Sequence, residues 1–284
     1  MAGRTGRSHC DWQPAKRRMK RRRYPGPPRQ IACHGGQRLI DWFNFREPVS
    51  SWTHFLWLLL AFPGTWLLWR RSRGDRLKQS GMLAFGLGLV LCYGGSWLFH
   101  AVRLSPEAVD RFNTLDHIGI YVLIAGSCTP IALVVLRGAW RLSLMLLLWL
   151  FALVGIVLCL TPLRMPIEVS TALYLIMGWL GCLTYFELAG RLSHAAVRPV
   201  WIGGLLYSTG AVLNVVGWPT IVPGVFEAHE VFHLFVMGGS LSHYWFMLRV
   251  VAPYRRASDG GRVVELWPLP SLVGTARDAP GAAD

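Results

Sequence analysis

Seven long uncharged stretches constrain the fold of this 284-residue chain more than any other feature of its sequence. Each is about 18 to 23 residues long, enough to cross the roughly 30 Å hydrocarbon core of a bilayer as a helix. The apolar runs are continuous and do not alternate, and a helix satisfies its own backbone in lipid, so helices are expected in preference to a barrel. The predicted spans are 52–69, 80–102, 115–136, 139–161, 168–189, 200–218 and 229–250. The sequence therefore predicts an all-α integral membrane protein, a bundle of seven transmembrane helices.

The segments outside the predicted spans are too short to form a separate domain. The N-terminal tract KRRMKRRRYPGPPRQ is basic and contains prolines, a composition typical of disorder. We therefore expect a basic, disordered tail at 1–46, a seven-helix transmembrane domain at 47–252 and a disordered tail at 253–284. Because the first strongly apolar run begins only near Trp52, we expect no signal peptide, and Met19 is a second candidate start.

Basic residues are concentrated before the first span. The formal net charge is +14, and 12 of the 29 Lys and Arg residues lie in this region. In a soluble protein this would indicate nucleic acid, but a basic block beside a span is usually a topology or lipid signal. We therefore expect membrane lipids as partners, with an anionic lipid surface for the tail, and no nucleic acid. The remaining charges favour neither orientation, and the sequence does not indicate an oligomeric state.

Neither the cysteines nor the glycine-rich pieces indicate a cofactor. The six cysteines are scattered without a C-x-x-C pair, so they predict neither a disulfide framework nor a thiolate metal site. The pieces FGLGLVLCYGGS and MGGSLSH lack the strand, turn and helix context of a nucleotide-binding motif. Small residues within spans favour close helix packing instead.

Polar residues inside the predicted spans gather in three short motifs. Such residues are costly in lipid and usually face an interior or a water-filled cavity. The motifs are SWLFH with Ser96 and His100, TLDHIGIY with Asp116, and HEVFH with His229 and His233. Counted from the N-terminus, the second span ends, and the third and seventh begin, on the membrane side of the N-terminus. All three motifs are therefore expected to share that face.

This convergence predicts a metal site. His229 and His233 lie on one stripe of a helix because they are four residues apart, and Ser96 lies one turn deeper than His100. Three neutral imidazoles with an open fourth position suit catalytic Zn²⁺. Asp116 is then available to hold a metal-bound water or to orient a ligand histidine. The alternative is that each histidine simply hydrogen-bonds a neighbour, but three separate motifs at one face and depth favour the metal.

Four other polar residues are weaker candidates for the site. His117 points about 100° away from Asp116 on a helix, which makes it a weaker ligand candidate. His243 lies about 15 Å deeper than His233, where we expect a packing or hydrogen-bonding role, and a structural role is also expected for Glu47 and His54. Glu47 and His54 flank the start of the first span in REPVSSWTHF. Pro48 and the serine pair at 50–51 in this stretch indicate a helix start with its cap.

With these residues identified, the chain resembles the hemolysin III family, the bacterial branch of the progestin and adipoQ receptor group. The resemblance runs from about Glu47 to Arg249 and is carried by EPVSSWTH, SWLFH, LDHIGIYVLIAGSCTP and PGVFEAHEVFHLFVMGGSLSHY, in that order. The chain departs from the usual family pattern at Ser50, where asparagine is common, and in GSCTP, where GTYTP is frequent. Neither departure affects a proposed ligand.

The resemblance implies a seven-helix bundle with one zinc ion held by His100, His229 and His233. It also implies that Ser96 and Asp116 are the family's conserved serine and aspartate, the aspartate lying near a metal-bound water. Members are said to keep the N-terminus cytoplasmic. The metal site would then lie near the cytoplasmic leaflet of the bacterial inner membrane.

Several functions fit such a site. The first is a zinc-dependent hydrolase acting on a lipid amide or ester, with Asp116 accepting a proton and Ser96 orienting or stabilising an oxyanion. This activity, or a regulatory role in membrane lipid homeostasis, agrees with the resemblance. A non-catalytic sensor or receptor with a structural metal is an alternative, as is a cytolytic pore. The motif HEVFH also matches H-E-x-x-H metalloproteases, in which Glu230 would be the general base, although a glutamate at a helix start is favoured by the helix dipole alone.

Overall fold

The computed structural model describes residues 45–161 and 165–255 of the chain. Most of these residues are helical, and the only extended pairing among them is an isolated bridge between Val222 and Phe226. The long helices are α1 (Pro48–Arg71), α2 (Arg76–Ala101), α3 (Pro106–Val134), α4 (Gly138–Leu160), α7 (His194–Val216) and α8 (Ala228–Phe246). A further helical stretch consists of α5 (Ile167–Trp179), the 3₁₀ turn η1 (Leu180–Thr184) and α6 (Tyr185–Ala189), and a π-helical turn η2 (Met247–Val251) extends α8. The predicted tails lie almost entirely outside the described residues.

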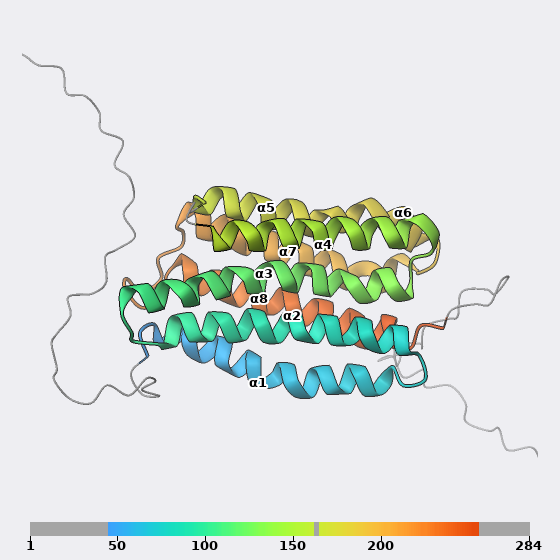
Figure 1. Ribbon diagram of the computed structural model, residues 1–284, viewed down its shortest axis with the longest axis horizontal. Helices are drawn as coiled ribbons and strands as arrows, with labels where there is room; N and C mark the ends of the chain where they lie inside the picture. The colour runs from blue at the N-terminus through green and yellow to red at the C-terminus, as the bar shows by residue number, and fades with distance from the viewer. Residues whose placement is uncertain (1–44, 162–164, 256–284) are drawn as a thin grey trace, which may run out of the picture. The chain divides into compact units, whose positions relative to one another are not determined.

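The helices lie roughly parallel to one another, with α1 at one edge of the bundle and α4 and α5 at the other (Figure 1). Consecutive helices pack together along α1, α2, α3 and α4, and α8 packs against both α7 and α1. This arrangement brings the start of α1, the end of α2 and the start of α8 to the same end of the bundle. The three polar motifs therefore meet at one end, as the crossing count predicted.

Large apolar side chains cover the outer surface of the bundle. On α4, for example, Leu142, Leu146 and Leu150 follow one another every four residues and are 61%, 62% and 58% exposed. Soluble proteins rarely expose a continuous apolar stripe of this kind, whereas a bilayer favours it. The outer surface is thus suited to lipid.

Five helical stretches are long and apolar enough to cross a membrane, namely α2, α3, α4, Ile167–Ala189 and α7. The prediction of a multi-pass, all-α membrane protein is therefore confirmed, while the count of seven spans stays a prediction. Among the described helices, α1 and α8 are less apolar: α1 contains two serines, two threonines and a histidine, and α8 contains Glu230 and three histidines. The predicted span 168–189 is interrupted by the 3₁₀ turn η1.

A glycine seam lets α2 and α3 approach closely. The seam consists of Gly81, Gly88 and Gly95 on α2 and Gly119 and Gly126 on α3, each seven residues from the next on its helix. A Cβ added to Gly119 would lie 2.6 Å from the Cα of Cys92, and one added to Gly95 would lie 3.2 Å from the backbone nitrogen of Asp116. Only glycine permits such an approach of two backbones. The close contact at Gly95 places the next residue, Ser96, beside Asp116.

Candidate metal centre

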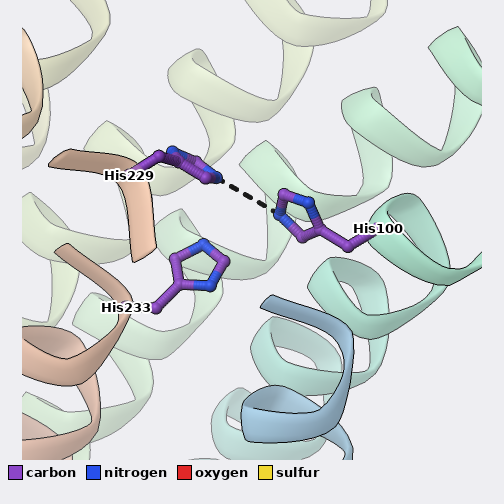
Figure 2. Close-up of side chains that lie close together, drawn as sticks. All are labelled: His100, His229 and His233. Carbon is purple, nitrogen blue, oxygen red and sulfur yellow. Dashed lines mark hydrogen bonds between the residues drawn. The ribbon is translucent and has the colours of Figure 1, made fainter. Parts of the chain in front are cut away.

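Three histidines converge where α2 ends and α8 begins. His100 lies in the last turn of α2, and His229 and His233 lie in the first two turns of α8. Each offers one ring nitrogen, and these three nitrogens lie within 4.8 Å of one another (Figure 2). His100 and His233 are buried and His229 is partly buried. The described part of the chain thus brings together all three histidines that the sequence predicted as ligands, and the group can hold a metal ion.

The neighbours of two of these rings indicate which nitrogen carries the proton. The Nδ1 atom of His100 lies against the carboxylate Oε2 of Glu47, and the Nδ1 atom of His229 lies 3.3 Å from the amide Oδ1 of Asn214. Both oxygens are acceptors, so each Nδ1 is assigned as the N–H donor. The Nε2 atoms then carry lone pairs, and they face each other at 3.3 Å.

Two facing lone pairs repel each other unless a cation lies between them. Ligand nitrogens about 2.0 to 2.1 Å from a tetrahedral metal are separated by roughly 3.3 Å, which matches the Nε2–Nε2 distance. His233 is the third member of the group, because one of its ring nitrogens lies within 4.8 Å of the nitrogens that His100 and His229 offer. The donor set therefore fits a divalent metal.

The start of α8 is held in place by its two glutamates. Glu227 and Glu230 form a reciprocal capping box, in which Oε2 of Glu230 accepts a hydrogen bond from the backbone N–H of Glu227 at 2.9 Å. The other oxygen of Glu230 accepts from the hydroxyl of Ser50 at 3.0 Å. Both carboxylate oxygens of Glu230 thus have structural partners, which disfavours the general-base role that the protease alternative requires.

Ser96 and Asp116 lie side by side on α2 and α3. The hydroxyl of Ser96 lies close to the carboxylate of Asp116, and Ser96 is buried. Both residues line an interior cavity of about 180 Å³, together with His233 and His54. The predicted serine and aspartate are therefore paired with each other, and they share a cavity with one of the clustered histidines.

Side chains from α1 contact the site in a way that the sequence did not predict. Glu47 bonds His100, Ser50 bonds Glu230, and the ring of His54 stacks on that of His233 with centroids 3.9 Å apart. Glu47, Ser50 and His54 are spaced by three and four residues and therefore share one stripe of a helix. That spacing within EPVSSWTH is the signal that the sequence contains, although Pro48 and the serine pair in the same stretch also fit a helix start.

The predicted cap of the first helix was wrong in detail. Helix α1 does begin at Pro48, but its N-cap is Glu47, whose side chain makes no capping hydrogen bond. Ser50 instead reaches α8, and the hydroxyl of Ser51 donates to the carbonyl of Glu47 at 2.7 Å. The two serines therefore make contacts within α1 and between helices instead of capping α1. The first turn needs less capping because it begins at Pro48, which has no N–H.

The expectations for the two other histidines are confirmed. Nδ1 of His117 lies 2.8 Å from the carbonyl of Asn113 on its own helix, and His117 is not part of the cluster. Nε2 of His243 donates to the carbonyl of Val200 on α7 at 3.3 Å. His243 also lines the interior cavity.

Apolar helices with a cluster of three histidines at one end define a multi-pass membrane protein with a candidate metal site. Comparison with known proteins identifies its family. Residues 43–244 match the family model for haemolysin-III related proteins, so the chain belongs to this family and the resemblance found in the sequence is confirmed.

Curated relatives agree with this assignment. The chain is 32% identical over 209 residues to a hemolysin-3 homolog of Bacillus subtilis, covering 72% of this chain and 95% of the relative. It is 32% identical over 213 residues to hemolysin-3 of Bacillus cereus, covering 74% and 94%. A more distant relative, the adiponectin receptor protein of Drosophila melanogaster, is 29% identical over 225 residues, covering 70% of this chain and 49% of the receptor.

Proposed function

We propose that this chain binds one zinc ion through His100, His229 and His233 and hydrolyses an amide or ester bond of a membrane lipid. The observation that carries the proposal is the pair of Nε2 atoms of His100 and His229, which face each other at 3.3 Å while both protons are assigned to Nδ1. A cation relieves the repulsion between these lone pairs. Among divalent metals, zinc is favoured by three imidazole ligands with one position left open.

The proposal includes seven spans. Helices α1 and α8 run beside the apolar helices and are tied to each other by polar contacts, with Trp57 Nε1 donating to Ser240 Oγ at 3.0 Å and Tyr244 Oη donating to the carbonyl of Gly64 at 3.1 Å. Such contacts stabilise helix pairs in lipid. With seven crossings of the bacterial inner membrane, the metal lies on the face of the N-terminus, which the family resemblance makes cytoplasmic.

Zinc in a three-histidine site supplies Lewis acidity and activates water at neutral pH. Asp116 is placed to accept the proton, since it lines the cavity beside His233 and lies near His100. In this proposal the hydroxyl of Ser96, which has one donor, forms a hydrogen bond to the Asp116 carboxylate. When Asp116 accepts a proton it becomes a weaker acceptor. The hydroxyl of Ser96 can then donate its hydrogen bond to an oxyanion on the substrate.

The interior cavity provides a place for the substrate. Apart from its few polar groups, it is lined by apolar and aromatic side chains of α2, α3, α5, α7 and α8, among them Ile120, Leu123 and Trp201. An apolar cavity with polar groups gathered at one wall suits a ligand that has a hydrocarbon chain and a polar bond to be cleaved. This arrangement supports a lipid substrate.

Zinc content and turnover, measured on detergent-purified protein, test the proposal. Wild type should contain about one zinc per chain and should cleave a fluorogenic lipid amide or lipid ester. Asp116→Asn should retain the zinc and lose turnover by about 10² to 10⁴-fold, because it removes the proton acceptor and leaves the ligands in place. Wild type without zinc would overturn the proposal.

A sensor or receptor is the second candidate, and one observation favours it. Of the three clustered histidines, only His233 lines the cavity. A metal enclosed by the helix ends would act as a clamp between α2 and α8 rather than as a catalyst. Zinc in wild type without hydrolysis of either class of bond would support this candidate over the hydrolase.

A further inference from the structure

The residues just before α1 are attached to the end of α2. The Arg46 guanidinium lies over the ring of Phe99 at 4.5 Å, and its Nη2 donates to the carbonyl of Phe99 at 2.5 Å. The backbone N–H of Glu47 donates to the carbonyl of His100 at 3.1 Å. These contacts fix the backbone of Glu47 relative to His100 without using the carboxylate of Glu47.

The carboxylate of Glu47 is then held between two partners. Its Oε2 accepts a hydrogen bond from Nδ1 of His100, and its Oε1 lies 3.1 Å from Nη1 of Arg46. Both oxygens of the Glu47 carboxylate therefore have a partner, and its orientation is fixed.

A helix-capping role does not account for this orientation. Glu47 occupies the N-cap position of α1, yet its side chain accepts no hydrogen bond from the first turn of that helix. Pro48, in that first turn, has no N–H to satisfy. Glu47 also lies outside the group of residues able to share a metal, which in the described ranges consists of His100, His229 and His233.

We infer that Glu47 is a positioning residue of the proposed metal site, holding His100 by its Nδ1–H so that Nε2 faces His229. A carboxylate in this position fixes the tautomer and rotation of a ligand histidine and increases its basicity, and losing it typically lowers metal affinity about 10 to 100-fold. The inference rests on the proposed function, because it requires a metal at the three histidines. The N-cap residue of α1 would then contribute to a site whose three ligands come from α2 and α8.

Cobalt binding tests the inference through a readout that does not depend on turnover. Full-length protein in detergent, stripped of metal, is titrated with Co²⁺ while the visible absorption bands of tetrahedral cobalt are followed. Glu47→Ala should weaken Co²⁺ binding toward 100-fold, and Glu47→Gln about 10-fold, because the amide oxygen can still accept from Nδ1 but carries no charge. The matched control is Glu230→Gln, the same substitution beside His229 in a carboxylate that contacts Ser50 and the backbone of Glu227. Glutamine serves equally in a capping box, so this variant should bind Co²⁺ within about twofold of wild type.

The outcomes distinguish the proposed metal site from the positioning role of Glu47. Wild type without cobalt bands would remove the proposed metal site and the inference with it. Wild-type binding together with equal binding by the Glu47 variants would overturn the inference and leave the metal site standing. An equal loss in Glu230→Gln would also overturn it, because the effect would then belong to any carboxylate near the site. If metal-free Glu47→Ala is unfolded by circular dichroism, Glu47→Gln decides the question, since it keeps the backbone contacts and the length of the side chain.

Discussion

Polar groups are buried at both ends of the α1, α2 and α8 group, but they are satisfied differently. At the end away from the histidines, Nζ of the buried Lys78 donates to the carbonyls of Ala252 at 2.9 Å and Tyr254 at 2.6 Å. An ammonium group only donates and a carbonyl only accepts, so donor and acceptors match in this arrangement. At the histidine end, two acceptor nitrogens face each other.

The difference separates polar groups that hold the fold from polar groups that await a ligand. Lys78 caps the end of the last helical turn, where its ammonium group donates to two carbonyl acceptors. The histidines need a cation to balance their lone pairs, because buried polar groups are normally paired. If this distinction is correct, loss of a clustered histidine changes metal content, and loss of Lys78 changes stability.

Loss of a clustered histidine is expected to have the largest effect. His100→Ala, His229→Ala or His233→Ala should each abolish zinc binding, since the two remaining imidazoles are one protein ligand fewer than the site needs. His117→Ala and His243→Ala are matched controls, because these rings bond backbone carbonyls outside the cluster. Elemental analysis of purified protein provides the measurement, and full zinc retention in His100→Ala would show that the cluster is not the site.

Loss of Lys78, at the end away from the histidines, should lower stability and leave zinc content unchanged. Lys78→Met removes the donor to two buried carbonyls and should destabilise the protein by about 2 to 4 kcal/mol while zinc content stays at the wild-type value. Arg249→Met is the control, since Arg249 is an exposed cation stacked on Trp245 at 4.5 Å and is worth about 0.5 to 1 kcal/mol. Unfolding followed in mixed detergent micelles compares the two variants. A loss of zinc in Lys78→Met would remove the distinction between the ends.

The glycine seam between α2 and α3 is expected to have an intermediate effect. Gly119→Ala places a Cβ 2.6 Å from the Cα of Cys92 and should cost about 1 to 3 kcal/mol, because two backbones must separate. Gly204→Ala on α7 meets nothing within 4 Å and should be neutral or stabilising by up to about 1 kcal/mol. The same unfolding measurement applies, and equal effects of the two changes would contradict the close approach.

Ser50→Ala should have the smallest effect. It removes one hydrogen bond between α1 and Glu230 and should destabilise the protein by about 0.5 to 1.5 kcal/mol. Zinc content should not change, because Ser50 contacts the residue beside a ligand and not the ligand itself. A marked drop in zinc would instead place Ser50 among the residues that position the site.

Much of this architecture could be predicted from the sequence because hydropathy and helical spacing are local properties. The apolar runs predicted a helical membrane protein, and counting crossings placed SWLFH, TLDHIGIY and HEVFH at one end. The close spacing of His229 and His233, and their meeting with His100, required only the four-residue periodicity of a helix and the order of the spans. Such patterns do not determine the number of spans, because polar residues in α1 and α8 lower the mean hydropathy of these two helices.

Only the tertiary structure determined how these residues are paired. Hydropathy could not show that Glu47 bonds His100, that His54 stacks on His233, or that the 3₁₀ turn η1 interrupts the fifth predicted span. The tautomers of His100 and His229 depend on oxygens supplied by Glu47 and Asn214, which are 53 and 15 residues away in sequence. The sequence by itself determined that the three histidines share one end of the bundle. Packing between helices determined which other side chains reach them and which atoms face each other, because contacts between distant segments leave no periodic signal in the chain.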